Sequence, residues 1–432
     1  MPVLKGTPPP RSRLKNIVGG SAGNLVEWFD WYVYSAFALY FARSFFPKGD
    51  ATAQLLNTAA IFAVGFVVRP IGAWLMGIYA DHQGRKAGLM LSVSLMCIGS
   101  LMIAVSPTYA QVGVFSPATL LVARIIQGLS LGGEYGSSAT YLSEMADRER
   151  RGFWSSFQYV TIIGGQLTAL ALLVVLQATL GEEAMQEWGW RIGFGAGALL
   201  AIVVFFIRRK LDETLSYENV AAKSDRRRSS AVNLFRDHPR EAFLVMALTA
   251  GGTAAFYAYT IYLQKFLANT SGFDRATASQ IMTVALMVML LIQPLAGRLS
   301  DRIGRKPLMI FFGVSATLFT FPIFAALEHP RTIPGAFALV MAALVMVTGY
   351  TSINAIIKAE LFPADIRALG VALPFAIANA IFGGTAEYVA LFLKNIGHER
   401  WFYIYISLLA ACSLVAYARM RETKTTSLIE ED

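Results

Sequence analysis

Apolar residues fall into twelve long stretches along the chain, separated by shorter polar segments. Each stretch has roughly the 20 mostly apolar residues that an α-helix needs to cross the hydrocarbon core of a bilayer. Several contain Gly and Pro, which membrane helices tolerate because neighbouring groups satisfy the freed backbone atoms. The pattern predicts an all-α polytopic membrane protein with twelve transmembrane helices, at residues 16–42, 54–80, 87–106, 116–145, 152–179, 188–207, 241–268, 276–297, 307–327, 334–357, 367–393 and 401–418.

The composition agrees with this pattern. Of the 432 residues, 55% are hydrophobic and only 15% are charged, whereas soluble domains carry about 25% charged residues. This argues strongly against a water-soluble enzyme. Cys97 and Cys412 lie far apart in apolar stretches, so neither a disulfide framework nor a zinc site is expected. The basic segment from Met1 to Lys15 has no small-residue cleavage site, so we expect no removable signal peptide.

The distribution of Lys and Arg predicts the orientation. With both termini in the cytoplasm, about 26 of these residues lie on the cytoplasmic side and 7 on the opposite side, as the positive-inside rule requires. The net charge of +9 is then mostly a topology signal, and no nucleic-acid partner is expected. The polar segment 208–240 is expected to be a cytoplasmic linker between a first six-helix half, 1–207, and a second, 241–432.

A polar pattern that occurs twice indicates an internal repeat. The second and eighth spans are each followed by Gly-x3-Asp-x2-Gly-Arg, at an offset of 220 residues, and the fourth and tenth by a Glu and an Arg seven residues apart. Glycines allow close helix contact and tight turns, and carboxylates accept hydrogen bonds from helix N-termini. We expect these residues to lock the halves in one state and release them in another: Gly77, Asp81, Gly84, Arg85, Glu144 and Arg151, then Gly297, Asp301, Gly304, Arg305, Glu360 and Arg367.

These two loops resemble the signature loop of the major facilitator superfamily. The pattern Arg124-x2-Gln127-Gly128-x3-Gly132-Gly133-Glu134 resembles a second motif of that superfamily, associated with proton-linked members. Residues 24–30 are similar to the metabolite:proton symporter family, and segments 132–136, 157–161 and 382–389 resemble its α-ketoglutarate-carrying branch. The resemblance covers nearly the whole chain. It implies the major facilitator fold, two pseudo-symmetric six-helix halves, and a multi-pass protein of the bacterial inner (plasma) membrane.

Acidic residues inside the expected spans are candidates for proton coupling. Glu27 and Asp30 are three residues apart on the first span, so they share one helix face. Two carboxylates this close together hold a proton more readily than one alone. Either residue is expected to carry the transported proton, with Glu134 on the fourth span as a third candidate. The alternative is a static pair with a neighbouring Arg.

Four cations also fall within or at the ends of the spans, where a charge costs roughly 2.5–3.5 kcal/mol at the helix centre. Arg124 is expected to hold the coupling acid, the substrate or each in turn, because Arg grips carboxylates with two hydrogen bonds. Arg69 either joins that site or pairs with Asp30 or Glu27. Lys265 and Lys358 either bind a substrate carboxylate or extend to the membrane interface.

Uncharged polar residues on the same helices are candidates for hydrogen bonds to a small solute, although each is equally compatible with packing. These are Gln127, Tyr34, Tyr159, Tyr257 and Asn354. All four histidines fall in loops or at span ends, so carboxylates are expected to carry any proton coupling. The sequence has no phosphate-binding loop, catalytic constellation or metal-ligand cluster, so we expect neither an ATP-driven pump, an enzyme, a metal nor another cofactor.

The expected function is therefore proton-coupled import of a small dicarboxylate. The resemblance implies α-ketoglutarate as the substrate, moved by alternating access with the site at the midplane between the halves. The alternative is another carboxylate or a zwitterion on the same frame, such as citrate, shikimate, proline or betaine. The expected partners are a small anionic metabolite, protons and the lipid bilayer, and no oligomer is required.

Overall fold

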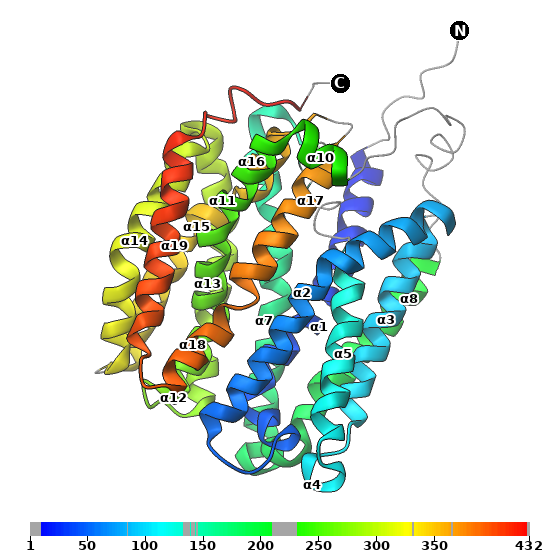
Figure 1. Ribbon diagram of the computed structural model, residues 1–432, viewed down its shortest axis with the longest axis vertical. Coiled ribbons are helices and arrows are strands. Elements are labelled where there is room, and N and C mark those ends of the chain that lie inside the picture. Colours follow the sequence, from blue (N-terminus) through cyan, green and yellow to red (C-terminus); the bar gives the residue numbers. More distant parts are fainter. Residues whose placement is uncertain are drawn as a thin grey trace.

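The computed structural model describes residues 10–83, 85–132, 139, 143, 146–209, 231–330, 332–363 and 366–429. These residues form an elongated bundle of helices, and the described part contains no strand (Figure 1). The first helix begins and the last helix ends at the same end of the bundle, which we call the termini end (Figure 1). We call the opposite end the far end.

The N-terminal half supplies six long helices, each coinciding with an expected span. They are joined by short segments that include the helix α4, the 3-10 helix η1 and the π-helix η2. In chain order the elements are α1 (Pro10–Phe45), α2 (Ala51–Gln83), α3 (Arg85–Val105), α4 (Tyr109–Val112), α5 (Phe115–Leu131), η1 (Arg148–Arg150), α7 (Arg151–Ala184), η2 (Met185–Gly189) and α8 (Trp190–Arg209).

The C-terminal half also crosses the bundle six times, but three of its crossings are interrupted. The elements are α10 (Ala231–Asp237), α11 (Pro239–Tyr257), η3 (Ala258–Tyr262), α12 (Leu263–Asn269), α13 (Arg275–Ile303), α14 (Lys306–Glu328), α15 (Ile333–Thr351), α16 (Asn354–Glu360), α17 (Arg367–Ala378), η4 (Asn379–Gly383), α18 (Ala386–Asn395) and α19 (Arg400–Arg419). The expectation of twelve spans in two halves is confirmed. The expected linker differs in one respect, because α10 makes part of it helical.

The interruptions have local causes. A π-helical turn, η3, separates α11 from α12, and another, η4, separates α17 from α18. Pro374 lies inside α17, where it lacks the N–H of a regular helix. Between α15 and α16 the backbone leaves helical geometry at Ile353, and the side-chain amide of Asn354 donates to the carbonyl of Thr351 at 3.2 Å. An apolar run in the sequence carries no sign of these breaks.

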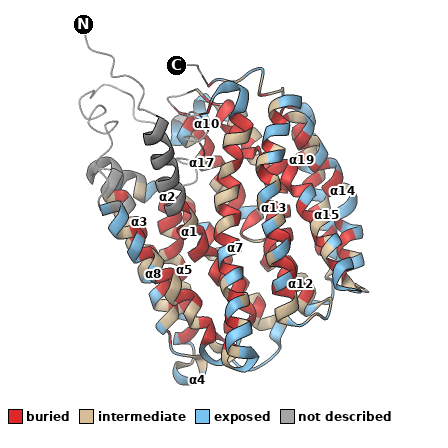
Figure 2. Ribbon diagram, turned by 180° about the vertical axis from the view of Figure 1, so that it is seen from behind, coloured by how far each residue is buried: buried red, intermediate tan, exposed pale blue. Residues whose placement is uncertain are grey.

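The outer faces of the bundle are apolar. Large side chains such as Trp74, Leu291 and Leu408 are at least 60% exposed, which suits contact with lipid tails rather than water. Figure 2 shows exposed residues along the outward sides of the helices and buried residues toward the middle. Eight stretches of the described residues are long and apolar enough to cross a membrane, and one of them, Arg148–Ile207, contains both α7 and α8.

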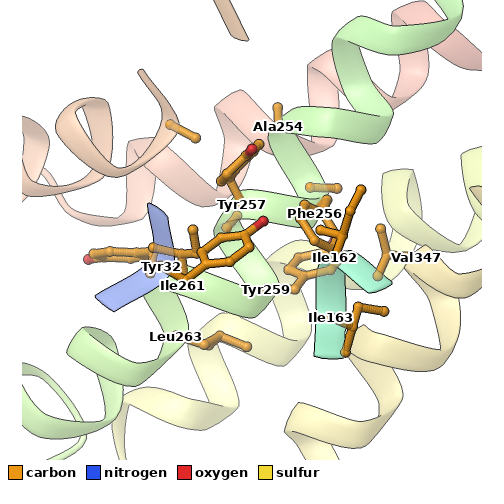
Figure 3. Packing of buried hydrophobic residues seen from close by; sticks show 14 of the residues in the cluster. Tyr32, Ile162, Ile163, Ala254, Phe256, Tyr257, Tyr259, Ile261, Leu263 and Val347 are labelled. Carbon is orange, nitrogen blue, oxygen red and sulfur yellow. The ribbon is translucent and has the colours of Figure 1, made fainter. Parts of the chain in front are cut away.

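The halves meet mainly where α7 packs along α13. Glycines permit the approach at the termini end, since a Cβ added to Gly297 would lie 2.5 Å from the carbonyl oxygen of Gly152. At mid-height, residues of α1, α7 and α11 gather in one cluster (Figure 3), with Tyr32 and Tyr257 among them. At the far end, the amide of Gln177 donates to Ser279 Oγ at 3.3 Å. Contacts therefore join the halves along their full height.

Candidate functional site

A buried tryptophan separates two buried arginines in the N-terminal half. The guanidinium carbon of Arg69, on α2, lies 4.0 Å from the ring centroid of Trp31, and that of Arg124, on α5, lies 3.9 Å from it. Trp31 and Arg124 are fully buried, and Arg69 is 7% exposed. Cation–π contact of this kind stabilises a desolvated guanidinium by about 2 kcal/mol without occupying its N–H donors.

The glycines of the fourth-span motif bring these arginines together. A Cβ at Gly128 would collide with the carbonyl oxygen of Gly65, and a Cβ at Gly132 would collide with that of Arg69. Helices α5 and α2 therefore touch backbone to backbone, as small-x3-small spacing allows in membranes. A Cβ at Gly65 would also lie 2.8 Å from the Trp31 ring. The spacing of small residues thus fixes the position of Arg124 beside Trp31.

Both arginines present the same unsatisfied edge. Arg124 Nη1 donates to Gln127 Oε1 at 2.8 Å, but its Nε and Nη2 have no hydrogen-bond partner within the described residues. The Nε and Nη2 of Arg69 are likewise without a partner there. Two adjacent N–H groups on one edge of a guanidinium match the two oxygens of a carboxylate. Leaving such charged donors buried and unbonded is costly, so these edges are suited to an anion.

Asp30 lies on the other side of Gln127 from Arg124. Its carboxylate accepts hydrogen bonds from Gln127 Nε2 at 2.9 Å and from the hydroxyl of Ser100 on α3. Gln127 Nε2 also donates to Ser100 Oγ at 2.9 Å. A Cβ at Gly197, on α8, would lie 2.6 Å from the carboxylate. Gln127 therefore links a buried carboxylate to a buried guanidinium with one amide group.

Tyrosines extend the polar site from Arg69 across the boundary between the halves. The Tyr257 hydroxyl, on α11, interacts with Arg69 and with Asn379. Tyr32 and Tyr159, on α1 and α7, lie near it, and all three tyrosines are at most 3% exposed. The aromatic rings of Phe66 and Tyr257 meet edge to face at 5.1 Å. The cluster thus contains hydroxyl groups from both halves.

Lys358 provides a cation at the C-terminal side of this cluster. Its Nζ, on α16, donates to Asn354 Oδ1 at 2.8 Å and lies 3.9 Å from the ring centroid of Phe375. Tyr159 interacts in turn with Asn354. Lys358 is only 1% exposed, so it does not extend to the membrane interface. Residues from Arg69 to Lys358 form a polar path through the middle of the bundle.

Lys265 is buried as well, but it has an acidic partner. Its Nζ, on α12, lies 2.8 Å from Glu387 Oε1, on α18, and donates to Ser35 Oγ, on α1, at 2.7 Å. The side chain of Lys265 is fully buried, which contradicts the alternative that it extends to the interface. The role of Glu387 was not evident from the sequence, and the structure assigns it the charge opposite Lys265.

The second signature loop joins the halves at the termini end. Asp301 accepts hydrogen bonds from the backbone N–H groups of Gly152 and Phe153, at 2.7 and 2.9 Å. Both residues lie in the first turn of helix α7. Arg305 Nη1 lies 2.8 Å from Asp301 Oδ1, and its Nη2 lies 3.6 Å from Glu360 Oε1. Gly304 adopts φ 97°, a conformation that glycine tolerates best. Asp301 thus caps a helix of the other half, and the locking and release of the halves by these residues stays a prediction.

The C-terminal segment closes over the same loop. Glu422 accepts hydrogen bonds from the N–H groups of Arg305 and Lys306 at 2.9 and 3.0 Å. Arg367 donates to the carbonyls of Phe362 and Leu428 at 3.0 and 2.8 Å. Arg367 therefore fastens the backbone around the loop. Arg151, 5% exposed at the start of α7, is a neighbour of Glu360.

The remaining expected residues have varied positions. Glu27 is buried on α1, and Tyr34 donates its hydroxyl to the carbonyl of Thr58 at 2.9 Å while its ring lies 4.4 Å from the Arg124 guanidinium. Arg69 lies against the aromatic rings of Trp31 and Phe66 and beside Tyr257. The carboxylate of Asp30 is hydrogen-bonded to Ser100 and Gln127. Six residues named from the sequence lie outside the side chains that the structure describes: Gly77, Asp81, Gly84, Arg85, Glu134 and Glu144.

Sequence reasoning missed several residues that build the site. Trp31, Ser100 and Ser35 were not predicted from the sequence, because each looks like a packing residue on an apolar helix. Trp31 follows Trp28 at a spacing of three residues on the first span, so both aromatic rings face the same way, and this spacing was an available signal. The pairing of Glu387 with Lys265 joins residues 122 positions apart in the sequence, and no local pattern predicts it.

Comparison with known proteins places the chain among transporters. The family model for "Sugar (and other) transporter" matches residues 16–227 and again 217–432. The alpha-ketoglutarate permease of Escherichia coli (strain K12) is 55% identical over 94% of this chain and 93% of its own length. The citrate-proton symporter of Salmonella typhi is 32% identical over 93% of this chain and 92% of its own length.

Solved structures agree on the fold. A proton:xylose symporter of the major facilitator superfamily, bound to 6-bromo-6-deoxy-D-glucose, superposes with a TM-score of 0.76 over 96% of this chain and 97% of its own. Its sequence identity is 19%, so the likeness concerns the fold alone. The expectation of a major facilitator fold is confirmed.

Proposed function

The chain belongs to the sugar (and other) transporter family, and we propose that it is a proton-coupled symporter that imports α-ketoglutarate by alternating access. The observation that carries this proposal is the pair of guanidinium edges on Arg69 and Arg124, buried beside Trp31 and without partners among the described residues. The name of the Escherichia coli relative supports the choice of substrate.

A dicarboxylate suits this site because it carries two negative charges. Arg69 and Arg124 keep their charge at any physiological pH, and each presents two N–H donors to a carboxylate. Lys358 adds a third cation from the other half, so a bound dianion would touch both halves. A zwitterion such as proline or betaine brings one carboxylate and one positive charge. The positive charge would be repelled by the buried cations, which favours a dicarboxylate over a zwitterion.

Asp30 is the residue that we assign to proton coupling. Its carboxylate shares Gln127 with Arg124. Protonation would remove the negative charge that faces Gln127 and Ser100 and would weaken these bonds. The Gln127 amide would then be free to reorient, and Arg124 would lose the partner that holds its Nη1. Proton binding at Asp30 thereby presents more of Arg124 to the substrate.

Access alternates between the two ends as the halves rock about the central site. The Asp301 and Arg305 contacts close the termini end, and contacts such as Gln177 to Ser279 close the far end. The surplus of Lys and Arg on loops at the termini end supports a cytoplasmic location for that end. The protein then lies in the bacterial inner membrane with residues 1–207 and 241–432 as its halves and 208–240 as the linker.

Uptake by proteoliposomes tests the proposal. Labelled α-ketoglutarate should accumulate inside vesicles when the outside is more acidic, and a protonophore should abolish the accumulation. Excess unlabelled α-ketoglutarate should compete fully, and proline or betaine should not compete. Uptake that ignores both the gradient and the protonophore would contradict symport. Stronger competition by citrate or shikimate than by α-ketoglutarate would contradict the substrate and leave the transport class intact.

A further inference from the structure

Two interrupted helices place an ion pair just beyond their π-helical turns. Lys265 follows η3 by three residues, and Glu387 follows η4 by four. Their charged atoms are 2.8 Å apart and both side chains are at most 5% exposed. The pair therefore fastens α12 to α18, the two segments that reach the far end of the C-terminal half (Figure 1).

A second set of bonds joins the same two segments nearer the far end. Lys394, on α18, donates to the carbonyl of Asn269 on α12 at 3.1 Å and to the hydroxyl of Thr270. Thr270 and Tyr262 both donate to Glu399 Oε1, at 2.7 and 2.9 Å. Helices α12 and α18 are thus tied together at two heights, although their nearest ends are 117 positions apart in the sequence.

The tied segments meet the N-terminal half in two ways: α18 packs along α2, and polar contacts join both segments to α1. Lys265 donates to Ser35 on α1, and Ser35 donates to Glu387 Oε2 at 3.4 Å. Gln264 Nε2 lies 3.4 Å from the carbonyl of Ala36. At the start of α18, a Cβ at Gly384 would collide with the Phe66 side chain. Ser35 is the member of the N-terminal half that contacts both charges.

The two π-helical turns, η3 and η4, are suited to act as hinges. A π-helical turn lacks the regular backbone hydrogen bonds between residues i and i−4, and such turns often occur at functional sites in helices. Hinges need only a few residues at element ends to absorb a change in backbone angles. A buried ion pair keeps its energy only while its partners stay together, so α12 and α18 lose least if they move as one.

We propose that α12 and α18 form one gate at the far end, with Glu387 as the positioning residue that aims Lys265 at Ser35 and with η3 and η4 as its hinges. In the closed gate, Ser35 bridges the two charges. Opening breaks the Ser35 contact, separates α18 from α2 and leaves the Lys265–Glu387 pair intact. The gate moves relative to α14 and α15 of its own half, in addition to any rocking of the two halves. It does not depend on the identity of the substrate.

Spin-label distances in the full-length protein without substrate test this proposal. Labels replace exposed Ile396 at the end of α18 and one of three positions: Asn269 on α12, Ile333 on α15 or Phe115 on α5. Cys97 and Cys412 are first replaced by Ala. In Ser35→Ala, the 396–333 and 396–115 distributions should shift to longer distances, while 396–269 should stay single and unchanged.

Variants of the Lys265–Glu387 pair test whether the ion pair holds α12 and α18 together. In Glu387→Gln the 396–269 distribution should broaden, because the tie is lost. Should this variant fail to fold, the uncharged double variant K265M/E387M serves instead, since apolar replacement of a buried pair is often tolerated. Ser94→Ala, which removes a hydroxyl that donates to the carbonyl of Met90 within α3, is the matched control and should leave all distances unchanged.

Two results would overturn the gate. One is an unchanged 396–333 distribution in Ser35→Ala together with a longer 396–115 distance, because the whole C-terminal half would then move as a rigid body. The other is a 396–269 distribution that is unaffected by loss of the ion pair. Neither result bears on the substrate or on proton coupling, which the uptake experiment tests separately.

Discussion

Asp301 in the C-terminal half accepts a 2.7 Å hydrogen bond from the backbone N–H of Gly152 in the N-terminal half. Gly152 opens helix α7, whose first N–H groups have no partner within the helix. A carboxylate at a helix N-terminus is also favoured by the helix dipole. One side chain thus closes the termini end by capping a helix of the other half, and it must release that cap when this end opens.

Gly297→Ala tests how closely the halves must approach there. The added Cβ would lie 2.5 Å from the Gly152 carbonyl oxygen, so the termini end should be forced open. We expect increased labelling of a cysteine placed at Ser156 by a membrane-impermeant thiol reagent added from the termini side. We also expect a lower temperature of unfolding, since overpacking costs roughly 1–3 kcal/mol.

Gly195→Ala is the matched control for that substitution. Gly195 lies inside α8, and an added Cβ there meets nothing within 4 Å. It should leave thiol labelling unchanged and raise stability by about 0.5–1 kcal/mol, because Ala loses less entropy than Gly in a helix. Equal labelling in the two glycine variants would mean that Gly297 does not set the gap between the halves.

Arg69→Gln and Arg124→Gln should each weaken substrate binding. Each loses a charge-assisted contact of about 1.5–3 kcal/mol, which corresponds to roughly a 10- to 100-fold rise in KM for α-ketoglutarate. Replacement by Lys should recover little, because Lys lacks the planar fork. Saturation kinetics in vesicles measure the effect. Arg209→Gln, at an exposed position, is the control, and wild-type KM in both site variants would remove the assignment.

Asp30→Asn should separate proton coupling from substrate binding. The amide cannot release a proton, but it retains the size of the carboxyl group and an acceptor for Ser100. We expect loss of accumulation driven by a proton gradient, with exchange of labelled for unlabelled α-ketoglutarate retained. Both are measured in the same vesicles, with exposed Glu183→Gln as the control. Gradient-driven accumulation at wild-type levels in Asp30→Asn would transfer the role to another carboxylate.

Lys358→Gln tests the contribution of the C-terminal half to binding. Lys358 is held by Asn354 and by the ring of Phe375, and its charge is the one that would draw the substrate toward that half. We expect a higher KM for α-ketoglutarate and a smaller effect on any monocarboxylate that the protein carries. Lys48→Gln, in an exposed loop, is the control. An equal loss for both kinds of substrate would indicate a structural role.

The architecture could be predicted from the sequence because span length, internal repetition and the cost of buried charge each leave few alternatives. Twelve apolar stretches of sufficient length admit few alternatives to twelve helices, and each expected span coincides with a helical crossing. The repeated loop singled out Asp301 and Arg305 because the same residue types recur at one offset, and Asp301 does bond to the N-terminal half. Buried charge is rare in membranes, so Arg69, Arg124, Lys265 and Lys358 were evident as candidates.

The partners of these residues were harder to predict. Arg69 had Asp30 or Glu27 as expected partners, yet it lies against Trp31 and Phe66, and an aromatic residue on an apolar helix looks like packing. Lys265 meets Glu387 just beyond the π-helical turns η3 and η4, and no pattern in the apolar residues predicts these turns. Side-chain pairing between distant helices depends on their rotation, which apolar periodicity does not fix.

Internal pH of reconstituted vesicles tests the central claim most directly. With a trapped pH dye and no imposed gradient, external α-ketoglutarate should acidify the vesicle interior, because each imported dianion brings protons with it. Proline should not do so, and the acidification should disappear in Asp30→Asn vesicles that still exchange labelled substrate. Entry of labelled α-ketoglutarate through the wild-type protein without any change of internal pH would contradict the account.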